Sequence, residues 1–505
     1  MNCQSHKPSF NPLQFPSCAP RFPLVTLLSF SHALRRNPFP LSLNSSFTQV
    51  HNYGTIDYES REAWNWRSLY RRIATMRDPN FGSSSVLNWW RKEGRKVSSW
   101  ELRRIIKELR KFRRFKLALE VYDWIFEHYK DFKVSSSDIA IQLDLISKVY
   151  GISDAEEFFM SLAENSKNEK TYGALLNAYV NAKAKDKAEV LIKEMRSEGY
   201  LSHALPFNDI MTLYMKTNEF EKVDSMIQEM RKRNIALDIY SYNIWITTCA
   251  ATANTEKMEE VFNQMKLDKN VSINWTTYST LAAMYARLGL FQKADNCLKE
   301  LESRISGRDR KPYNHLISLY ANIGKKEEVY RIWKSYKTSF ESIPNSSYHS
   351  MMSSLVRLGD LNGAEEVYEE WELSKSTYDP RICNVLLASY VREGMLEKAE
   401  MFVEHFCTRG GRSNPTTWEI LAEGFIKQQE IEKALSAMSE AASIKKFRHW
   451  QPKPKNVESI AELCKEKGDA TSAELLIEIL RKVKYLDTET YDSLTRACNK
   501  SGKPV

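Results

Sequence analysis

The body of the chain carries amphipathic stripes that recur at a fixed distance. Apolar residues repeat at i, i+3, i+4 and i+7, the spacing that places them on one face of a helix. Three consecutive stretches, beginning at Tyr242, Tyr278 and Tyr313, show the same order of features. Each opens with an aromatic residue and an apolar stripe, breaks at Gly or Asn, and continues into a charged stretch with its own stripe. The pattern predicts two amphipathic helices in each unit.

The break between the two helices is followed, five positions later, by a small residue. These anchors are Gly289 with Ala294, Gly359 with Ala364, Gly394 with Ala399, and Gly468 with Ala473. Glycine permits the positive φ that ends a helix, and alanine lets two helices approach closely. The anchors recur with a period of about 35 residues. Because such pairs bury their faces only by stacking, the sequence predicts an all-α solenoid superhelix of helix-turn-helix repeats.

Counting by these anchors divides the chain into four parts. Residues 57–98, rich in tryptophan, are expected to form a helical N-terminal cap, and residues 99–487 about eleven repeats. Residues 488–505 are expected to be a truncated repeat that caps the C-terminal end. Residues 1–56 are set apart by composition and are excluded from the fold.

The first 56 residues contain no Asp or Glu and are rich in Ser and Pro. Their few basic residues are Lys7, Arg21, Arg35 and Arg36. This composition is typical of an organellar transit peptide, and a disordered tail is the alternative. High Ser with few Arg favours the chloroplast, whereas the Arg35–Arg36 pair leaves the mitochondrion as the alternative organelle.

The net charge of +9 is unevenly placed along the chain. The segment from Arg91 to Lys116 holds twelve Lys and Arg against three Glu, while residues 117–505 together carry about −5. This basic segment is a candidate for phosphate contact, and a solvated helix face is the alternative. The phosphate-contact candidates are Arg103, Arg104, Lys107, Arg110, Lys111, Arg113 and Arg114.

Catalytic and cofactor motifs are absent from the sequence. There is no glycine-rich phosphate loop, no H-E-x-x-H, and no zinc-deaminase signature. The eight cysteines form no C-x-x-C pair, so neither a disulfide framework nor a zinc site is indicated. We therefore expect no enzyme activity and no cofactor. No apolar run approaches the roughly 20 residues of a membrane span, so no membrane insertion is expected.

Two recurring details distinguish this repeat from the tetratricopeptide repeat, whose W-x₂-L-G-x₂-Y opening is missing. An aromatic residue and Asn open the first helix, and Met stands near the end of the second, as in Tyr242–Asn243, Tyr313–Asn314, Met195, Met230 and Met265. Asp or Asn closes several units. These features resemble the pentatricopeptide repeat (PPR) of plant organellar RNA-binding proteins, in the pure-repeat or P class.

The resemblance implies that each repeat addresses one RNA base through a first-helix side chain and the closing residue of the unit. It assigns U to Asn208 with Asp238, a pyrimidine to Asn243 with Asn274 and to Asn384 with Asn414, and G to Ser279 with Asp309. The expected RNA is U-pyrimidine-G, two unread positions, then a pyrimidine. The units with Gly173 and His203, Asn314 and Pro344, His349 and Asp379, Glu419, and Glu458 depart from the pattern. Ordinary helix capping is the alternative for the Asn and Ser residues.

The resemblance also implies a function. We expect an organellar protein that binds single-stranded RNA and acts in its processing, stabilisation, splicing or translation by occupying the transcript. Other RNA-processing or translation proteins are further expected partners, and DNA is not. A protein-binding scaffold in the organelle is the alternative, favoured by the net negative charge of residues 117–505 and by the departing units.

Overall fold

The computed structural model describes residues 63–76, 82–128, 134–306, 309–374, 378–444 and 450–485. The expected transit peptide (1–56) and C-terminal cap (488–505) lie outside these residues. Within them every regular element is a helix, as predicted. The helices are α2 (Ala63–Ala74), α3 (Ser83–Lys92), α4 (Ser99–Lys111), α5 (Phe115–His128), α6 (Ser136–Val149), α7 (Ile152–Ser161), η2 (Glu164–Ser166), α8 (Glu169–Asn181), α9 (Lys185–Ser197), α10 (Ala204–Lys216), α11 (Phe220–Lys232), α12 (Ile239–Ala251), α13 (Thr255–Leu267), α14 (Trp275–Arg287), α15 (Phe291–Ser303), α16 (Lys311–Asn322), α17 (Lys326–Ser339), α18 (Asn345–Arg357), α19 (Leu361–Ser374), α20 (Pro380–Arg392), α21 (Leu396–Thr408), α22 (Pro415–Lys427), α23 (Ile431–Ser443), α24 (Pro454–Lys467) and α25 (Ala470–Lys482).

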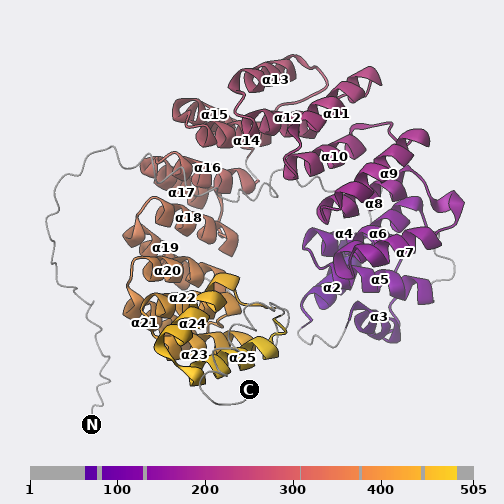
Figure 1. Cartoon of the computed structure of the whole chain (residues 1–505). Coiled ribbons are helices and arrows are strands. Elements are labelled where there is room, and N and C mark those ends of the chain that lie inside the picture. Colours follow the sequence, from indigo (N-terminus) through magenta and orange to yellow (C-terminus); the bar gives the residue numbers. More distant parts are fainter. Residues whose placement is uncertain are drawn as a thin grey trace, which may run out of the picture. The chain divides into compact units, whose positions relative to one another are not determined.

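The helices form consecutive pairs, each with an even-numbered first helix and an odd-numbered second helix (Figure 1). From α6 onward each first helix packs against its own second helix and against the first helix of the next pair. Second helices pack closely on one another only between α3 and α5 and between α23 and α25 among the described residues. The first helices therefore make the more continuous row, and the second helices the more open one. This stacking of pairs is the predicted all-α solenoid.

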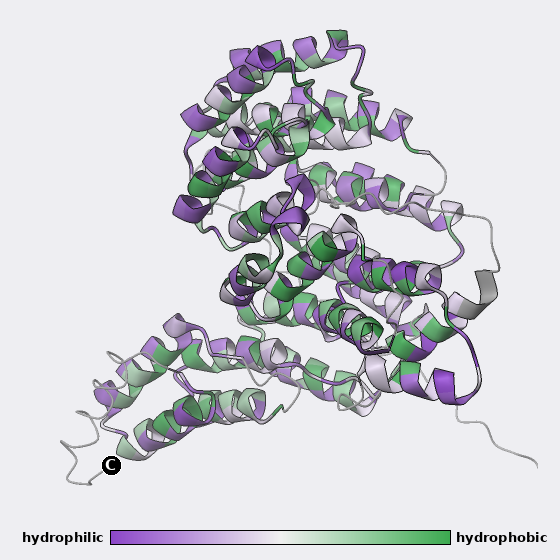
Figure 2. Cartoon of the chain, turned by 90° about the vertical axis from the view of Figure 1, so that its right-hand side faces the viewer, coloured by the Kyte–Doolittle hydropathy of each residue, from purple (hydrophilic) through white to green (hydrophobic). Residues whose placement is uncertain are grey.

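Most helices are amphipathic, and hydrophobic and hydrophilic residues alternate along the ribbons of Figure 2, whereas α12 is buried from Ser241 to Ala250. The predicted turn glycines have positive φ, from +66° at Gly468 to +79° at Gly394. At the turn after α14 the backbone N–H of Gly289 donates to Ala286, and that of Leu290 donates to Tyr285 at 2.8 Å. These bonds satisfy carbonyls that the end of the helix leaves open. The predicted Gly breaks are confirmed.

The small residue after each break packs at the contact between the two helices of a pair. Ala294, Ala364 and Ala399 each have no exposed surface, and each is the fourth residue of its second helix. A larger side chain at this place would force the helices apart in a close-packed interface. The alanines thus fix the approach of the helices, as the sequence pattern indicated.

A ladder of ion pairs connects consecutive second helices. An acid at the fifth residue of one second helix accepts from a lysine at the third residue of the next, at 2.5–2.7 Å. The pairs are Glu156–Lys187, Glu189–Lys222, Asp224–Lys257, Glu259–Lys293 and Glu365–Lys398. An aromatic side chain of the intervening first helix often joins the pair, as when Tyr390 Oη donates to Glu365 at 2.8 Å. We call this set of contacts the outer ladder.

Candidate nucleic-acid interface

One column of side chains runs along the row of first helices, at the residue that follows the opening aromatic or cysteine. We call it the reading column: Gly173, Asn208, Asn243, Ser279, Asn314, His349, Asn384 and Glu419. The closing residue of a unit caps or immediately precedes the next first helix, as Asp238 caps α12 and Asn414 caps α22. Because consecutive first helices pack together, a closing residue can reach the column residue of its own unit, and it does so in two of the four units predicted to read a base.

Asn208 and Asp238 meet as the sequence predicts. Asn208 Nδ2 donates to the two carboxylate oxygens of Asp238 at 3.0 and 3.2 Å. Asn208 Oδ1 accepts from Ser241 Oγ at 2.7 Å, and Asp238 accepts from the backbone N–H of Ser241 at 2.8 Å. Asp238 therefore caps α12 and holds Asn208 at once. The Asn208 side chain lies beneath Asp238, since it is only 2% exposed.

Asn384 and Asn414 form the same arrangement farther along the array. Asn384 Nδ2 donates to Asn414 Oδ1 at 3.2 Å, and Asn384 Oδ1 accepts from Thr417 Oγ1 at 2.8 Å. Asn414 also accepts from the backbone N–H of Thr417 at 2.9 Å. The offsets within this cluster equal those in the Asn208 cluster. The geometry is therefore a property of the repeat and not of one site.

Asn243 and Asn274 are not joined by a hydrogen bond. Asn274 caps α14 by accepting from the backbone N–H of Thr276 at 2.9 Å and from its Oγ1 at 2.6 Å. Asn243 Oδ1 is buried with no hydrogen-bond partner, and so is Thr277 Oγ1. A buried acceptor left in this way costs about 1–3 kcal/mol. This unit thus keeps an amide oxygen that a ligand donor can satisfy.

Ser279 is paired with a histidine instead of Asp309. Ser279 Oγ lies 3.0 Å from Nδ1 of His315, one residue beyond the column position of the next unit. Burial lowers the pKa of His315, and Lys311 lowers it further. Asp309 accepts from the backbone N–H of Lys311 at 3.0 Å, at the start of α16. The predicted Ser279–Asp309 pair is therefore not joined here.

The units that depart from the sequence pattern also differ in structure. Asn314 Oδ1 is buried without a partner, like that of Asn243. Burial lowers the pKa of His349, and the nearby Arg381 adds to the effect. Glu419 accepts from the backbone N–H of Lys453 at 2.6 Å, so its carboxylate binds the start of α24. Polar groups therefore occupy most of the column, but in different hydrogen-bonding states.

Two of the phosphate-contact candidates are held by acidic residues of the next first helix. The Arg103 guanidinium binds both carboxylate oxygens of Asp138 at 3.0 and 2.9 Å, and the hydrogen bonds raise its pKa although burial opposes this. Arg110 donates to Asp144 at 3.3 Å. Both acids are about 1% exposed, so these pairs join α4 to α6 within the fold. For Arg103 and Arg110 the structure favours a packing role over an open phosphate site.

The other candidates lie on or just after α4. Arg104 lies 3.6 Å from Glu108 and 5.3 Å from the Trp66 ring, and Lys111 lies 3.9 Å from Glu108. Lys107 is partly buried on the same helix. The remaining two, Arg113 and Arg114, are exposed at the turn that follows α4. Of the seven candidates, Lys111, Arg113 and Arg114 are thus the exposed ones.

A second set of cations, which sequence reasoning missed, stands at the last turn of several first helices. Its members are Arg287, Arg357, Arg392 and Lys427, all of them exposed, although Arg357 also donates to Asn322 and burial lowers its pKa. Each lies two residues before the residue of positive φ that ends the helix. This regular spacing is the feature of the sequence that could have identified these cations. These cations share the first-helix row with the reading column.

Side chains that could bind a metal ion are dispersed over the described part of the chain. No group of three or more His, Cys, Asp or Glu there is arranged to hold a metal ion. Of its cysteines, Cys249, Cys297, Cys383 and Cys464 are buried, and Cys407 is exposed. No helix there is long and apolar enough to cross a bilayer.

Comparison with known families identifies the repeat. The PPR repeat profile matches residues 170–200, 240–269, 276–304, 312–339, 346–375 and 381–410, and the PPR repeat family profile matches 206–251. The chain contains pentatricopeptide repeats. The matched stretches follow one another along the chain and contain the pairs from α8–α9 to α20–α21. They therefore include every column residue predicted to read a base.

Curated pentatricopeptide repeat proteins of Arabidopsis thaliana are similar to this chain. Pentatricopeptide repeat-containing protein At1g02150 is 57% identical over 303 residues, which are 58% of each chain. Pentatricopeptide repeat-containing protein At2g20710, mitochondrial, is 34% identical over 244 residues, 48% of this chain and 50% of that protein. The chain thus spans about half the length of these relatives.

Among solved structures, the chain resembles the pentatricopeptide repeat protein PPR10 from maize. The TM-score is 0.41 at 16% identity, over 87% of this chain and 66% of that one. For PPR10 in complex with an 18-nt psaJ RNA element the TM-score is 0.45 at 14% identity, over 86% and 66%.

Proposed function

We propose that this protein binds single-stranded RNA along its first-helix row, with one base against each of several repeats. The observation that carries the proposal is the pair of buried, unpartnered amide oxygens, Asn243 Oδ1 and Asn314 Oδ1, in the reading column. Unsatisfied buried acceptors are rare in folded proteins and call for an explanation. The Watson–Crick edges of bases carry N–H donors that meet this need.

The satisfied members of the column support the same proposal. Asn208 and Asn384 are each held by hydrogen bonds from two sides, which fixes their amide groups. Asp238 and Asn414 are the more exposed members of these pairs. An incoming base therefore meets the closing residue first, and contact with the amide requires one existing hydrogen bond to be exchanged. A fixed amide and cap are suited to select a base by its donors and acceptors.

The exposed cations at the ends of the first helices supply the attraction for phosphate. Four of them, Arg287, Arg357, Arg392 and Lys427, recur on the same row as the reading column. Single-stranded nucleic acid loses affinity with a slope of about −0.7 per neutralised phosphate on a logarithmic plot against salt. Four phosphate contacts then give a slope of about −3. Replacing Lys427 with Ala is expected to reduce the slope by about 0.7.

A designed RNA tests the proposal directly. We would measure the affinity of the full chain for a fluorescent RNA containing 5′-UCGAAC-3′ and for a control of the same composition in scrambled order. The expected result is at least tenfold tighter binding of the designed order, because each good base contact contributes about 1–3 kcal/mol. Asn243→Ala is expected to weaken the designed RNA and leave the scrambled RNA nearly unchanged.

A matched control is available on the second helices. Asn263 lies on α13, away from the reading column, so Asn263→Ala should change neither affinity. Equal binding of both RNAs that falls with salt would mean backbone contact without base readout, which refutes the assigned code. The absence of binding to either RNA would refute the RNA function and favour the protein-binding scaffold.

The proposed place of action is an organelle. The first 56 residues lack acids and are rich in Ser and Pro, as in transit peptides. The relative At2g20710 is named mitochondrial, and so is At4g21705, at 35% identity over 248 residues. These names favour the mitochondrion and give no support to the chloroplast that the Ser content favoured. Occupying a transcript requires no chemistry, so processing, stabilisation, splicing and translation all remain outcomes of the same binding step.

A further inference from the structure

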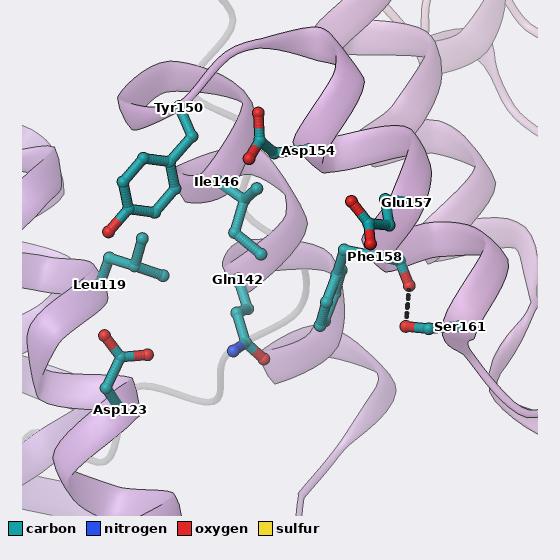
Figure 3. A pocket seen from close by; sticks show the side chains of 9 residues that line it. All are labelled: Leu119, Asp123, Gln142, Ile146, Tyr150, Asp154, Glu157, Phe158 and Ser161. Carbon is teal, nitrogen blue, oxygen red and sulfur yellow. Dashed lines mark hydrogen bonds between the residues drawn. The ribbon is translucent and has the colours of Figure 1, made fainter.

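A groove of about 410 Å³ opens between the second helices α5 and α7, with α6 at its base. Figure 3 shows Leu119 and Asp123 on one wall and Asp154 and Phe158 on the other. Ile146 and Gln142 come from α6, between the two walls. The groove therefore combines the apolar side chains of Leu119, Ile146 and Phe158 with the carboxylates of its two walls.

The outer ladder is interrupted at this step of the array. In five second helices, α9, α11, α13, α15 and α21, the third residue is the ladder lysine. In α7 this position is Asp154, and the fifth residue of α5 is Leu119 instead of an acid. No lysine of the ladder therefore connects α5 to α7.

At two other places in the array the fifth residue of the second helix is also leucine, but there the neighbouring second helices pack directly on each other. Leu87 of α3 and Leu435 of α23 are buried, as Leu119 is, but their helices pack closely on α5 and α25. Helices α5 and α7 do not make such close contact. The step from α5 to α7 has neither the ion pair nor the direct packing, and its surface is left open.

The acids of the groove have no cationic partner in the described part of the chain. No ion pair or hydrogen bond engages the carboxylates of Asp123, Asp154 or Glu157 there, whereas the ladder acids are paired. Burial raises the pKa of Asp123, and Glu120 raises it further. A positive charge in the groove would lower the pKa of Asp123 again, because it would stabilise the carboxylate. Tyr150, at the rim, is 62% exposed.

We propose that this groove is a docking surface for a basic polypeptide segment of a partner protein, which places an arginine or lysine side chain between α5 and α7. The stem of such a side chain covers Leu119, Ile146 and Phe158, and its charged end takes the place of the missing ladder lysine beside the carboxylates. RNA does not fit, because its phosphates carry the same sign of charge as the walls. The proposal is independent of RNA binding by the first-helix row.

The test uses the full chain and a defined probe. A fluorescein-labelled octapeptide of alternating arginine and leucine is titrated with the protein, and its anisotropy is followed. Its counterpart has glutamine in place of each arginine. We expect the arginine peptide to bind at least tenfold more tightly than the glutamine peptide, with an affinity that falls as salt is added.

Two charge reversals separate the groove from the overall charge. Asp154→Lys restores a lysine at the ladder position and is expected to weaken the arginine peptide at least tenfold. Glu256→Lys is the matched control, since Glu256 is likewise an exposed acid in the first turn of a second helix. It should change the affinity less than twofold. Asp154→Asn, which keeps the shape of the side chain, should weaken binding three- to fivefold and guards against an effect of misfolding.

Several outcomes would overturn the proposal. One is equal weakening by Asp154→Lys and Glu256→Lys, which would mean that only the net charge matters. Equal binding of the arginine and glutamine peptides would remove the role of the carboxylates. The proposal is also refuted if the arginine peptide does not bind the unaltered protein while circular dichroism shows that the protein is folded.

Discussion

Replacing two asparagines of the reading column with alanine should have unequal structural costs. Asn208→Ala removes the amide that donates to Asp238 and accepts from Ser241. Asn243→Ala removes an amide whose oxygen has no partner. The residues hold the same position in adjacent repeats and are 2% and 3% exposed, so burial does not distinguish them. The two residues differ in their hydrogen bonds.

The expected magnitudes follow from those bonds. A hydrogen bond to a charged group contributes about 1.5–3 kcal/mol and a neutral one about 0.5–1.5 kcal/mol. Asp238 keeps its two contacts with Ser241 after the change, so we expect Asn208→Ala to cost about 2 kcal/mol locally. For Asn243→Ala we expect a change below about 0.5 kcal/mol, because no hydrogen bond is lost and alanine favours the helix.

Hydrogen exchange followed by mass spectrometry is the suitable assay, because a long repeat array does not unfold in a single two-state step. At about 1.4 kcal/mol for each factor of ten, Asn208→Ala should speed exchange in α10 and α12 about 30-fold. Asn243→Ala should change it no more than about twofold in α12 and α14. Equal acceleration by the two variants would refute the view that one amide is structural and the other is held open for a ligand.

Three further predictions concern the scaffold. Lys398→Met removes the ladder contact with Glu365 and should speed exchange in α19 and α21 about twofold, since a partly exposed pair contributes about 0.3–1 kcal/mol. Ion pairs with lysine lower the pKa of Glu156 and lower that of Glu219 to about 2. The stability that these pairs contribute is therefore present above about pH 4 and is lost as the pH falls towards 2. The thermal midpoint should fall over that pH range, and the fall should be smaller in high salt. Gly394→Ala places a side chain at φ +79° and should cost about 1 kcal/mol, seen as faster exchange in α20 and α21; an unchanged rate would contradict the turn assignment.

Most of the fold could be predicted because its determinants are local. The turn at Gly394 needs a positive φ, and the burial of Ala399 follows from its fixed distance to that turn. Where another residue ends the helix, the turn is less visible in the sequence. Ala253 has φ +55° and Gln429 has φ +61°, although neither residue type favours a positive φ.

The candidate site was only partly predictable because its hydrogen bonds join different repeats. The meeting of Asn208 with Asp238 follows from the unit length and the packing of first helices. The pairing of Ser279 with His315 depends on side-chain rotamers in two adjacent units and has no sequence pattern of its own. The ion pair between Arg103 and Asp138 was missed for the same reason. Sequence shows that α4 is basic, and only the structure shows which of its cations are engaged.

The central claim is that the first-helix row reads RNA, and selection from a random pool tests it most directly. The full chain is incubated with random single-stranded RNA at moderate salt, and the retained RNA is sequenced. We predict enrichment of U-pyrimidine-G, followed by two unread positions and then a pyrimidine, and loss of the first U in the Asn208→Ala variant. Retained RNA with no enriched order, or no retained RNA, would contradict it.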